Sequence, residues 1–224
     1  MGTKFSTRVW VSVVGIASIF FGSKGYADTV ISVADFGLKP DTRENAVAYV
    51  QKAIEACRGK EPVTLVFPEG RYDFWPQYAH EKNYYETNTY DVFPKRLAML
   101  FEGLHNITVD GNGSQFVMHD RIQPITVENC DGVTLKNFSI DWDIPLTAQA
   151  RVTKVGSDFF EIEINVLESP YIIEDGKLVF VGEGWKSALG SMIEFESDTH
   201  FVVPGTGDLV LGRNWRDYTA VSPR

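Results

Sequence analysis

Two aspartates flank a tryptophan in the string NFSIDWDIP, and these three residues are the first candidates for chemistry. Asp141 and Asp143 stand two positions apart, so on a strand their side chains would share one face while Trp142 points to the other. A carboxyl pair beside an aromatic ring is what a glycosidase cleft offers. Aspartates at strand ends are also common turn formers, so a substrate contact and a structural turn both stay open.

A segment rich in aromatic residues, 75–96, breaks the pattern of the strands around it and shows no clean period. We take Trp75, Tyr78, Tyr84 and Tyr85 as candidate sugar-binding residues, because ring faces stack on sugars and neighbouring amides and acids bind hydroxyls. The alternative is a loop that packs its own aromatic side chains on the domain wall. If the segment binds sugar together with Asp141 and Asp143, all must lie on the same side of the domain.

The elements that position these residues contain a repeat. Residues 98–142 hold the same short pattern twice, with an offset of 26 residues. The matched positions are Met99/Ile125, Phe101/Val127, Glu102/Glu128, Ile107/Val133, Thr108/Thr134 and Val109/Leu135. A fixed period of this size indicates a solenoid, and the alternation of apolar and polar residues within each copy indicates strands.

The repeat predicts an all-β fold, a right-handed parallel β-helix. Stacking coils at about 4.8 Å would place Ile107 beneath Val133 and Val109 beneath Leu135, in a ladder inside the domain. The clusters GLHN, DGNG and NCDG would form the corners. Two unrelated β-arches in a sandwich are the alternative, because two repeats are fewer than a solenoid usually shows.

An N-terminal capping helix is predicted at about residues 41–58 of a β-helix domain that spans 28–146. Asp41 would cap the helix, and Glu44 three residues later would complete a capping box. The apolar stripe consists of Ala46, Val50, Ala53, Ile54 and Cys57. Gly59 would end the helix, which would cover the open end of the first coil.

The second half of the chain, residues 147–224, has a different rhythm. Short strands follow one another across glycine-rich links, which predicts a small antiparallel β-barrel or sandwich inserted into the solenoid. Neither another coil nor a cap follows before Arg224. The chain is therefore expected to be truncated.

The first 27 residues have the features of a secretory signal peptide: basic residues, a short apolar stretch and Gly25-Tyr26-Ala27 before the expected cut. Removing them takes away Lys4, Arg8 and Lys24 and no acid, which moves the net charge from −9 to −12. We expect an exported protein, periplasmic or extracellular, with no nucleic-acid or membrane partner. Cys57 and Cys130 lack companions for a metal site, and whether they form a disulfide is left open.

The string KNFSIDWDIPLTAQARV, taken with the aromatic segment, the coil LHNITVDGNGSQFVMH and the barrel-like tail, resembles the secreted bacterial α-1,3-galactosidases of glycoside hydrolase family one hundred and ten. The opening ADFG, capping helix and FPEGRY resemble the wider pectin-lyase-like superfamily. The resemblance implies an enzyme that removes terminal α-1,3-linked galactose with inversion and without a cofactor. The family's catalytic aspartates match nothing here, so the catalytic residues are expected beyond Arg224 and the chain is expected to be an inactive N-terminal fragment.

Two other classes of function stay open. One is a polysaccharide lyase on the same fold, although no acidic cluster with calcium-binding spacing stands out. The other is a non-catalytic carbohydrate-binding surface protein. The preference for linear or branched galactosides and the oligomeric state do not follow from these residues.

Overall fold

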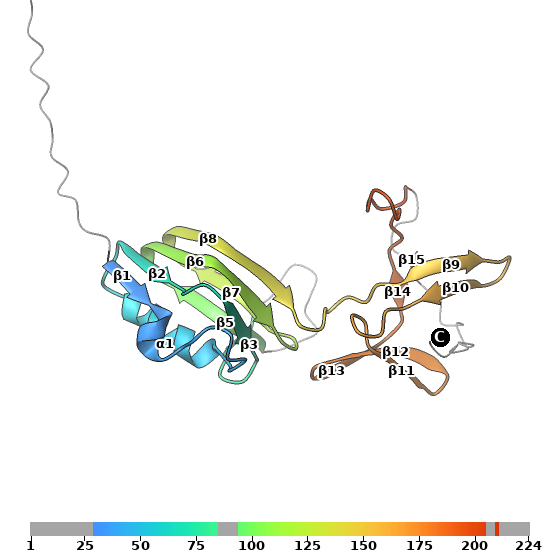
Figure 1. Ribbon diagram of the computed structural model, residues 1–224, viewed down its shortest axis with the longest axis horizontal. Helices are drawn as coiled ribbons and strands as arrows, with labels where there is room; N and C mark the ends of the chain where they lie inside the picture. The colour runs from blue at the N-terminus through green and yellow to red at the C-terminus, as the bar shows by residue number, and fades with distance from the viewer. Residues whose placement is uncertain (1–28, 85–93, 205–208, 211–224) are drawn as a thin grey trace, which may run out of the picture.

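The computed structural model describes residues 29–84, 94–204 and 209–210, and it has two regions (Figure 1). Stacked parallel strands and the α-helix form the first region, which we call the coil region, residues 29–146. Small antiparallel sheets form the second, which we call the hairpin region, residues 147–204 with 209–210. The predicted all-β class is confirmed, since the strands far outnumber the helical segments.

Two sheets build the coil region. The first has the order β1-β2-β6-β3, with β8 also paired to β6, and all its pairings are parallel. Its strands are β1 (Thr29–Ser32), β2 (Val63–Val66), β3 (Arg71–Phe74), β6 (His105–Met118) and β8 (Asp131–Trp142). In the second sheet β5 (Lys95–Glu102) pairs parallel to β7 (Gln123–Glu128), and β4 (His80–Lys82) pairs antiparallel to β5.

The register between the two copies of the repeat is the predicted one. Met99 lies opposite Ile125 and Phe101 opposite Val127, and Ile107 lies opposite Val133. The remaining predicted pairs, Glu102/Glu128, Thr108/Thr134 and Val109/Leu135, are also in register. The two copies are therefore direct neighbours, one strand apart and parallel.

The register shifts between Asp110 and Ser114. Gly111 lies at this shift, where a Cβ atom would come within 2.5 Å of the Phe138 Cβ. Only glycine allows the two strands to approach so closely. Beyond the shift the offset between partners is 24 residues, as in Gln115 opposite Ser139.

The ladder is buried on one side only, which corrects the expectation that both copies lie inside. Ile107 and Val109 are fully buried, whereas Val133 is half-buried and Leu135 is 41% exposed. Among the described residues, strand β8 has β6 on one side and no further strand of the sheet on the other. Its apolar side chains therefore lack the layer that covers β6.

The α-helix is α1 (Val47–Cys57), and it starts six residues later than predicted. Asp41 does not cap it: Asp41 has φ +61°, and its Oδ1 accepts a hydrogen bond from the Arg71 amide at 2.9 Å. The Asn45 side chain instead accepts from the Val47 amide at 3.1 Å. The predicted apolar stripe is buried throughout, and it packs towards β1, β2 and β5.

Aromatic side chains fill the end of the coil region that lies near the hairpins. Phe116 is fully buried, and its ring centroid lies 4.7 Å from that of Phe67 and 5.6 Å from that of Phe74. Phe138 of β8 stacks on Phe116 at 4.7 Å. This cluster supports the β3, β6 and β8 ends from within.

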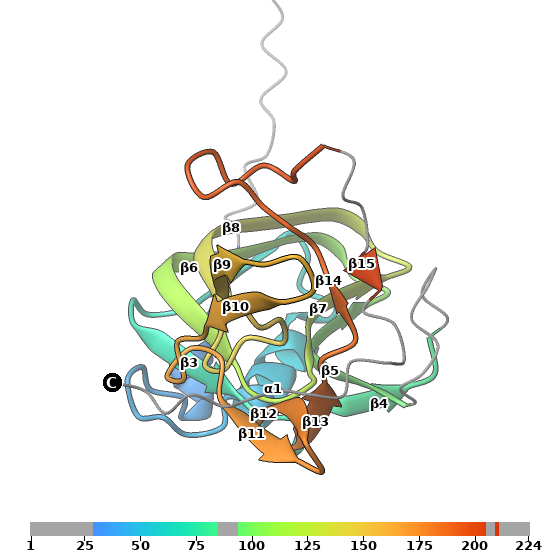
Figure 2. The ribbon, with the colours of Figure 1, turned by 90° about the vertical axis from the view of Figure 1, so that its right-hand side faces the viewer.

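The hairpin region contains separate antiparallel sheets (Figure 2). Strands β9 (Arg151–Val155) and β10 (Phe160–Glu163) form one, β11 (Tyr171–Glu174), β12 (Lys177–Gly182) and β13 (Trp185–Ala188) form another, and β14 (Ser191–Met192) pairs with β15 (Leu209–Val210). The prediction of short antiparallel strands is confirmed. Within the described residues these sheets remain separate rather than joining into one closed barrel.

Cys57 and Cys130 are free thiols. Burial raises the pKa of Cys57 to about 11. In the part of the chain that the structure describes, no helix has the length and hydrophobicity needed to span a membrane. The predicted signal peptide lies outside the described residues.

Candidate functional site

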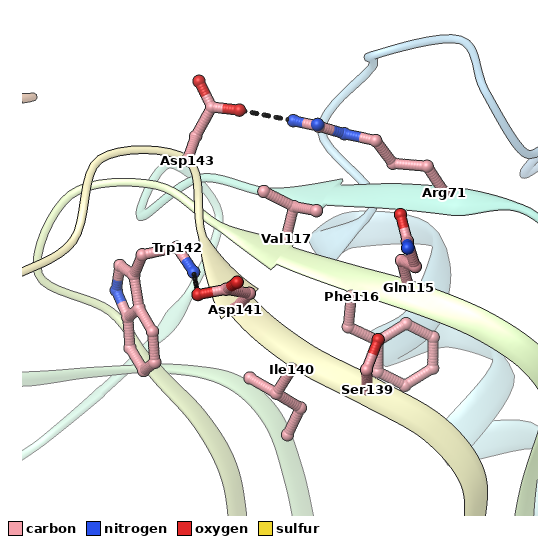
Figure 3. A pocket seen from close by; sticks show the side chains of 9 residues that line it. All are labelled: Arg71, Gln115, Phe116, Val117, Ser139, Ile140, Asp141, Trp142 and Asp143. Carbon is pink, nitrogen blue, oxygen red and sulfur yellow. Dashed lines mark hydrogen bonds and ion pairs between the residues drawn. The ribbon is translucent and has the colours of Figure 1, made fainter. Parts of the chain in front are cut away.

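Three parallel strands, β3, β6 and β8, end side by side and bring the candidate aspartates to one corner of the coil region. Their register sets Arg71, Gln115 and Ser139 in one row and places Asp73, Val117 and Asp141 in another row two residues further along. A depression of about 280 Å³ lies over these rows (Figure 3). Its lining residues are Arg71, Gln115, Phe116, Val117, Ser139, Ile140, Asp141, Trp142 and Asp143.

Asp141 and Trp142 alternate as the strand geometry predicts. Asp141 is exposed, and its carboxylate accepts a hydrogen bond from the Trp142 amide at 2.8 Å. Trp142 lies opposite Met118, is half-buried and packs on the hydrophobic core. Its indole Nε1 donates to the Asp120 carbonyl at 3.2 Å. Trp142 therefore supports the corner, and Asp141 faces solvent.

Asp143 closes the corner through backbone and side chain. Its amide donates to the Met118 carbonyl at 3.0 Å. Its Oδ1 accepts from Arg71 Nη2 at 2.7 Å, and Arg43 Nη1 lies 3.7 Å away. Asp143 is thus paired with arginine, although its side chain is 39% exposed.

Asp73 is a buried carboxylate beside Asp143 that sequence reasoning missed. Arg71 donates to it through Nη2 at 2.6 Å and through Nε at 3.0 Å, and His119 Nε2 lies 2.9 Å from Asp73 Oδ1. Burial by itself would raise the pKa of Asp73, but the hydrogen bonds from Arg71 and His119 outweigh it and lower the pKa. The hydrogen bonds that Arg71 donates to Asp73 and, to a smaller degree, to Asp143 raise the pKa of Arg71. Asp73 is therefore ionised.

Trp75 belongs to this corner as well. Its ring stacks on the His119 imidazole, with centroids 3.8 Å apart and planes 10° from parallel. Tyr78 of the same segment is 73% exposed, and its carbonyl accepts from the Gln51 side chain at 2.8 Å. Tyr78 is thus largely exposed, whereas His119 covers one face of the Trp75 ring.

Tyr84 lies elsewhere. Its hydroxyl donates to Glu128 at the end of β7, where Lys82 Nζ also bonds Glu102 at 2.7 Å and Glu128 at 2.9 Å. The hydrogen bond from Tyr84 is the main cause that lowers the pKa of Glu128. Strand β7 begins four residues after His119 and runs away from the corner for six residues. At ~3.3 Å per residue, its far end at Glu128 lies about 16 Å from its start. The structure therefore brings Trp75 to the corner but not Tyr84, and Tyr85 lies outside the described residues.

The corner also holds oxygen and nitrogen atoms of the kinds that bind metals. One such atom from each of Asp73, His119 and Asp143 lies within 4.8 Å of the others. Both carboxylates already accept hydrogen bonds from Arg71, so a cation would have to displace a guanidinium group. The arrangement fits an ion-pair network better than a metal site.

The depression beside this network is suited to a ligand rich in hydroxyl groups. Arg71, Gln115, Ser139 and Asp141 offer it a guanidinium, an amide, a hydroxyl and a carboxylate. Such a mixture of donors and acceptors is what a sugar requires. Sequence reasoning found only Asp141 of these four, because the 26-residue period fails at Gln115 and Ser139.

Comparison with known proteins gives a family match in the second half of the chain and relatives that align over most of its length. Residues 148–223 match the family described as GLAA-B beta-barrel domain I. Over 194 residues, 87% of the chain, the sequence is 59% identical to a protein of Bacteroides thetaiotaomicron named alpha-1,3-galactosidase B. The chain resembles the bacterial α-1,3-galactosidases. The resemblance predicted from the sequence is thus confirmed.

More distant relatives carry related names. A Shewanella woodyi protein named alpha-1,3-galactosidase A is 36% identical over 75% of the chain, and a Parabacteroides distasonis protein named alpha-1,3-galactosidase B is 34% identical over 96%. The aligned parts make up 31%, 28% and 36% of these three relatives. The chain therefore spans about a third of the length of the curated relatives that it matches.

Proposed function

We propose that this chain is part of an exo-acting glycoside hydrolase that removes terminal α-1,3-linked galactose from glycans with inversion. The observation that carries the proposal is the 59% identity over 194 residues to a named alpha-1,3-galactosidase. The homologues support a glycoside hydrolase family as such. The linkage, the exo action and the stereochemistry are part of the proposal.

The proposed role of the corner is to form one wall of the sugar cleft. Asp141, Gln115 and Ser139 would accept and donate hydrogen bonds to sugar hydroxyls, with Arg71 held in place by Asp73. Inverting hydrolysis also needs a protonated carboxyl group and a second carboxylate that activates water. Asp73 is ionised and buried, and Asp143 is paired with Arg71, so neither suits the acid role.

We therefore propose that the catalytic carboxyl groups lie in later coils. The parallel stacking of β6 on β8 and of β5 on β7 supports the proposal that these sheets are the first coils of a right-handed parallel β-helix. The chain by itself would then bind sugar weakly and release no galactose. Export to the periplasm or beyond, directed by residues 1–27, is part of the same proposal.

Incubating this chain and the longest natural form with an α-1,3-galactoside tests the activity, with proton NMR following the anomer released. The long form should release β-galactose, and this chain should release none. Release of the α-anomer would contradict inversion, and turnover by the short chain would place the catalytic pair within it. An unsaturated product would indicate a lyase, and binding without release by the long form would indicate a carbohydrate-binding protein.

The cleft wall is tested in the long form by Asp141→Asn. Losing a charged acceptor for a sugar hydroxyl costs about 1.5–3 kcal/mol, so we expect KM to rise roughly 10- to 100-fold. Asp131→Asn is the matched control, because Asp131 is also an exposed aspartate and lies at the opposite end of β8. Equal KM values for the two variants would remove Asp141 from the cleft.

A further inference from the structure

His119 joins the two regions of the molecule. Its Nε2 lies 2.9 Å from Asp73 Oδ1 in the coil region, and its Nδ1 lies 2.8 Å from Glu183 Oε2 in the turn between β12 and β13. The imidazole is only 3% exposed and is covered on one face by Trp75. A buried ring therefore lies between two carboxyl groups that are far apart in the sequence.

The turn fits the corner in other ways. The Asp120 amide donates to Glu183 Oε2 at 3.3 Å. Gly184 has φ +70°, and a Cβ atom there would come within 2.4 Å of Asp120 Oδ2, so the turn can approach only because this residue is glycine. The Arg121 guanidinium lies 6.0 Å from the Trp185 ring centroid. The corner and the β12–β13 turn therefore have complementary surfaces.

The number of N–H donors that the Asp73–His119–Glu183 bridge needs determines its protonation state. A neutral imidazole has one N–H donor and one acceptor, and an ionised carboxylate only accepts. Asp73 is held ionised by Arg71. With Glu183 also ionised, both ring contacts are hydrogen bonds only if His119 carries two N–H groups, so the closed bridge contains one proton more than the open one.

The other charged groups at the corner favour that extra proton. Asp120 and Asp143 add negative charge to that of Asp73 and Glu183. Arg71 and Arg43 are the cations beside Asp73 and Asp143. The carboxylates therefore outnumber the arginines, and an imidazole binds a proton more tightly than a carboxylate that solvent can reach.

We propose that His119 is a positioning residue that takes up one proton when the β12–β13 turn docks on the corner. As an imidazolium it holds Glu183 on one side and supports the Asp73–Arg71 pair on the other. Docking is then stronger at low pH and weakens as the pH rises and the ring loses its second N–H. This inference does not depend on the proposed galactosidase activity.

The experiment follows exchange of the Asp120 amide by NMR in the full chain between about pH 5 and pH 9, corrected for the intrinsic exchange rate. Protection should fall with pH, by up to about tenfold per unit, the limit for one released proton. Glu183→Gln should abolish this slope, since a glutamine amide can donate to the neutral ring. Glu174→Gln, in the exposed pair with Lys186, should keep the slope.

Unchanged slope in Glu183→Gln, or no slope in the unmodified chain, would overturn the proposal. The ¹⁵N shifts of the His119 ring give a test that needs no variant. At pH 5 both ring nitrogens should carry hydrogen while the turn is docked. A docked turn with a single ring N–H at that pH would equally overturn it.

Discussion

The coil region and the hairpin region are both made of strands, but they stabilise those strands differently. Within the part of the chain that the structure describes, nearly all buried apolar side chains belong to the coil region, and only those of Leu178 and Val179 lie in the hairpin region. Its exposed apolar side chains include Val155, Leu167 and Phe201. Parallel strands that lie directly over one another cover each other's apolar side chains, whereas an isolated hairpin buries little. Strand content alone therefore does not show how well a region is packed.

We expect the greatest change in the free energy of unfolding when phenylalanine is replaced by alanine in the coil region, and a much smaller change for the same replacement in the hairpin region. Phe116→Ala should lower the free energy of unfolding by about 3–5 kcal/mol, because a fully buried ring leaves a cavity among Phe67, Phe74 and Phe138. Phe201→Ala, at a side chain that is 73% exposed, should change it by less than about 0.5 kcal/mol. Urea denaturation followed by circular dichroism measures both. Equal losses would mean that the hairpin region has a core of its own.

The next effect concerns buried charge. Asp73→Asn leaves Arg71 and His119 without their ionised partner and should cost about 3 kcal/mol at pH 7. Since the folded pKa of Asp73 is lowered, its contribution is present above the unfolded value near 3.8 and is lost as the pH falls through the folded pKa. The unmodified chain should therefore lose stability on acidification more steeply than the variant.

Asp143→Asn provides the control for that experiment, because the Asp143 side chain pairs with the same Arg71 but is 39% exposed. A partly solvated pair should contribute no more than about 1 kcal/mol. If both variants lost the same stability, with the same dependence on pH, burial of Asp73 would not be what distinguishes them.

The smallest effect contrasts two lysines on the surface. Glu102 and Glu128 lie opposite each other in the register, and Lys82 bonds both of them. Lys82→Met should lower the Tm slightly, and about 1 M salt should remove the difference, since it screens the repulsion between the two glutamates. Lys154→Met removes an exposed ion pair with Glu161 and a contact with the Phe159 ring in the hairpin region, and it should leave the Tm nearly unchanged. A Tm difference for Lys82→Met that persists in salt would point to lost packing instead.

Much of the coil region was predictable because its signal is local and repeated. The 26-residue offset specified which strands are neighbours and which residues face each other, and the structure has each of those pairs. The apolar stripe of α1 was predictable for the same reason, since helical spacing is visible within a few turns. Its start was not. Asp41 bonds the Arg71 amide, thirty residues away, instead of capping the helix.

The candidate site was predictable only in part. Asp141, Asp143 and Trp75 do meet at one corner, but the residues that hold them there gave no signal in the sequence. Asp73 and His119 are 46 residues apart, and His119 and Glu183 are 64 apart. Single polar residues at such separations have no period, and only the folded chain shows that they are partners.

Three features follow from the sequence alone: the strand class, the register between the two copies of the repeat and the apolar stripe of the helix. They depend on alternation and on a repeat that neighbouring residues carry. Which carboxylates are buried, paired with arginine or open to solvent follows only from the folded chain. Asp73, Asp141 and Asp143 have the same side chain but different surroundings. Asp73 is buried between Arg71 and His119, Asp141 is an exposed hydrogen-bond acceptor, and Asp143 is a partly exposed partner of Arg71. The charge and reactivity of a carboxyl group depend on the groups folded around it, and the order of residues along the chain does not contain that information locally.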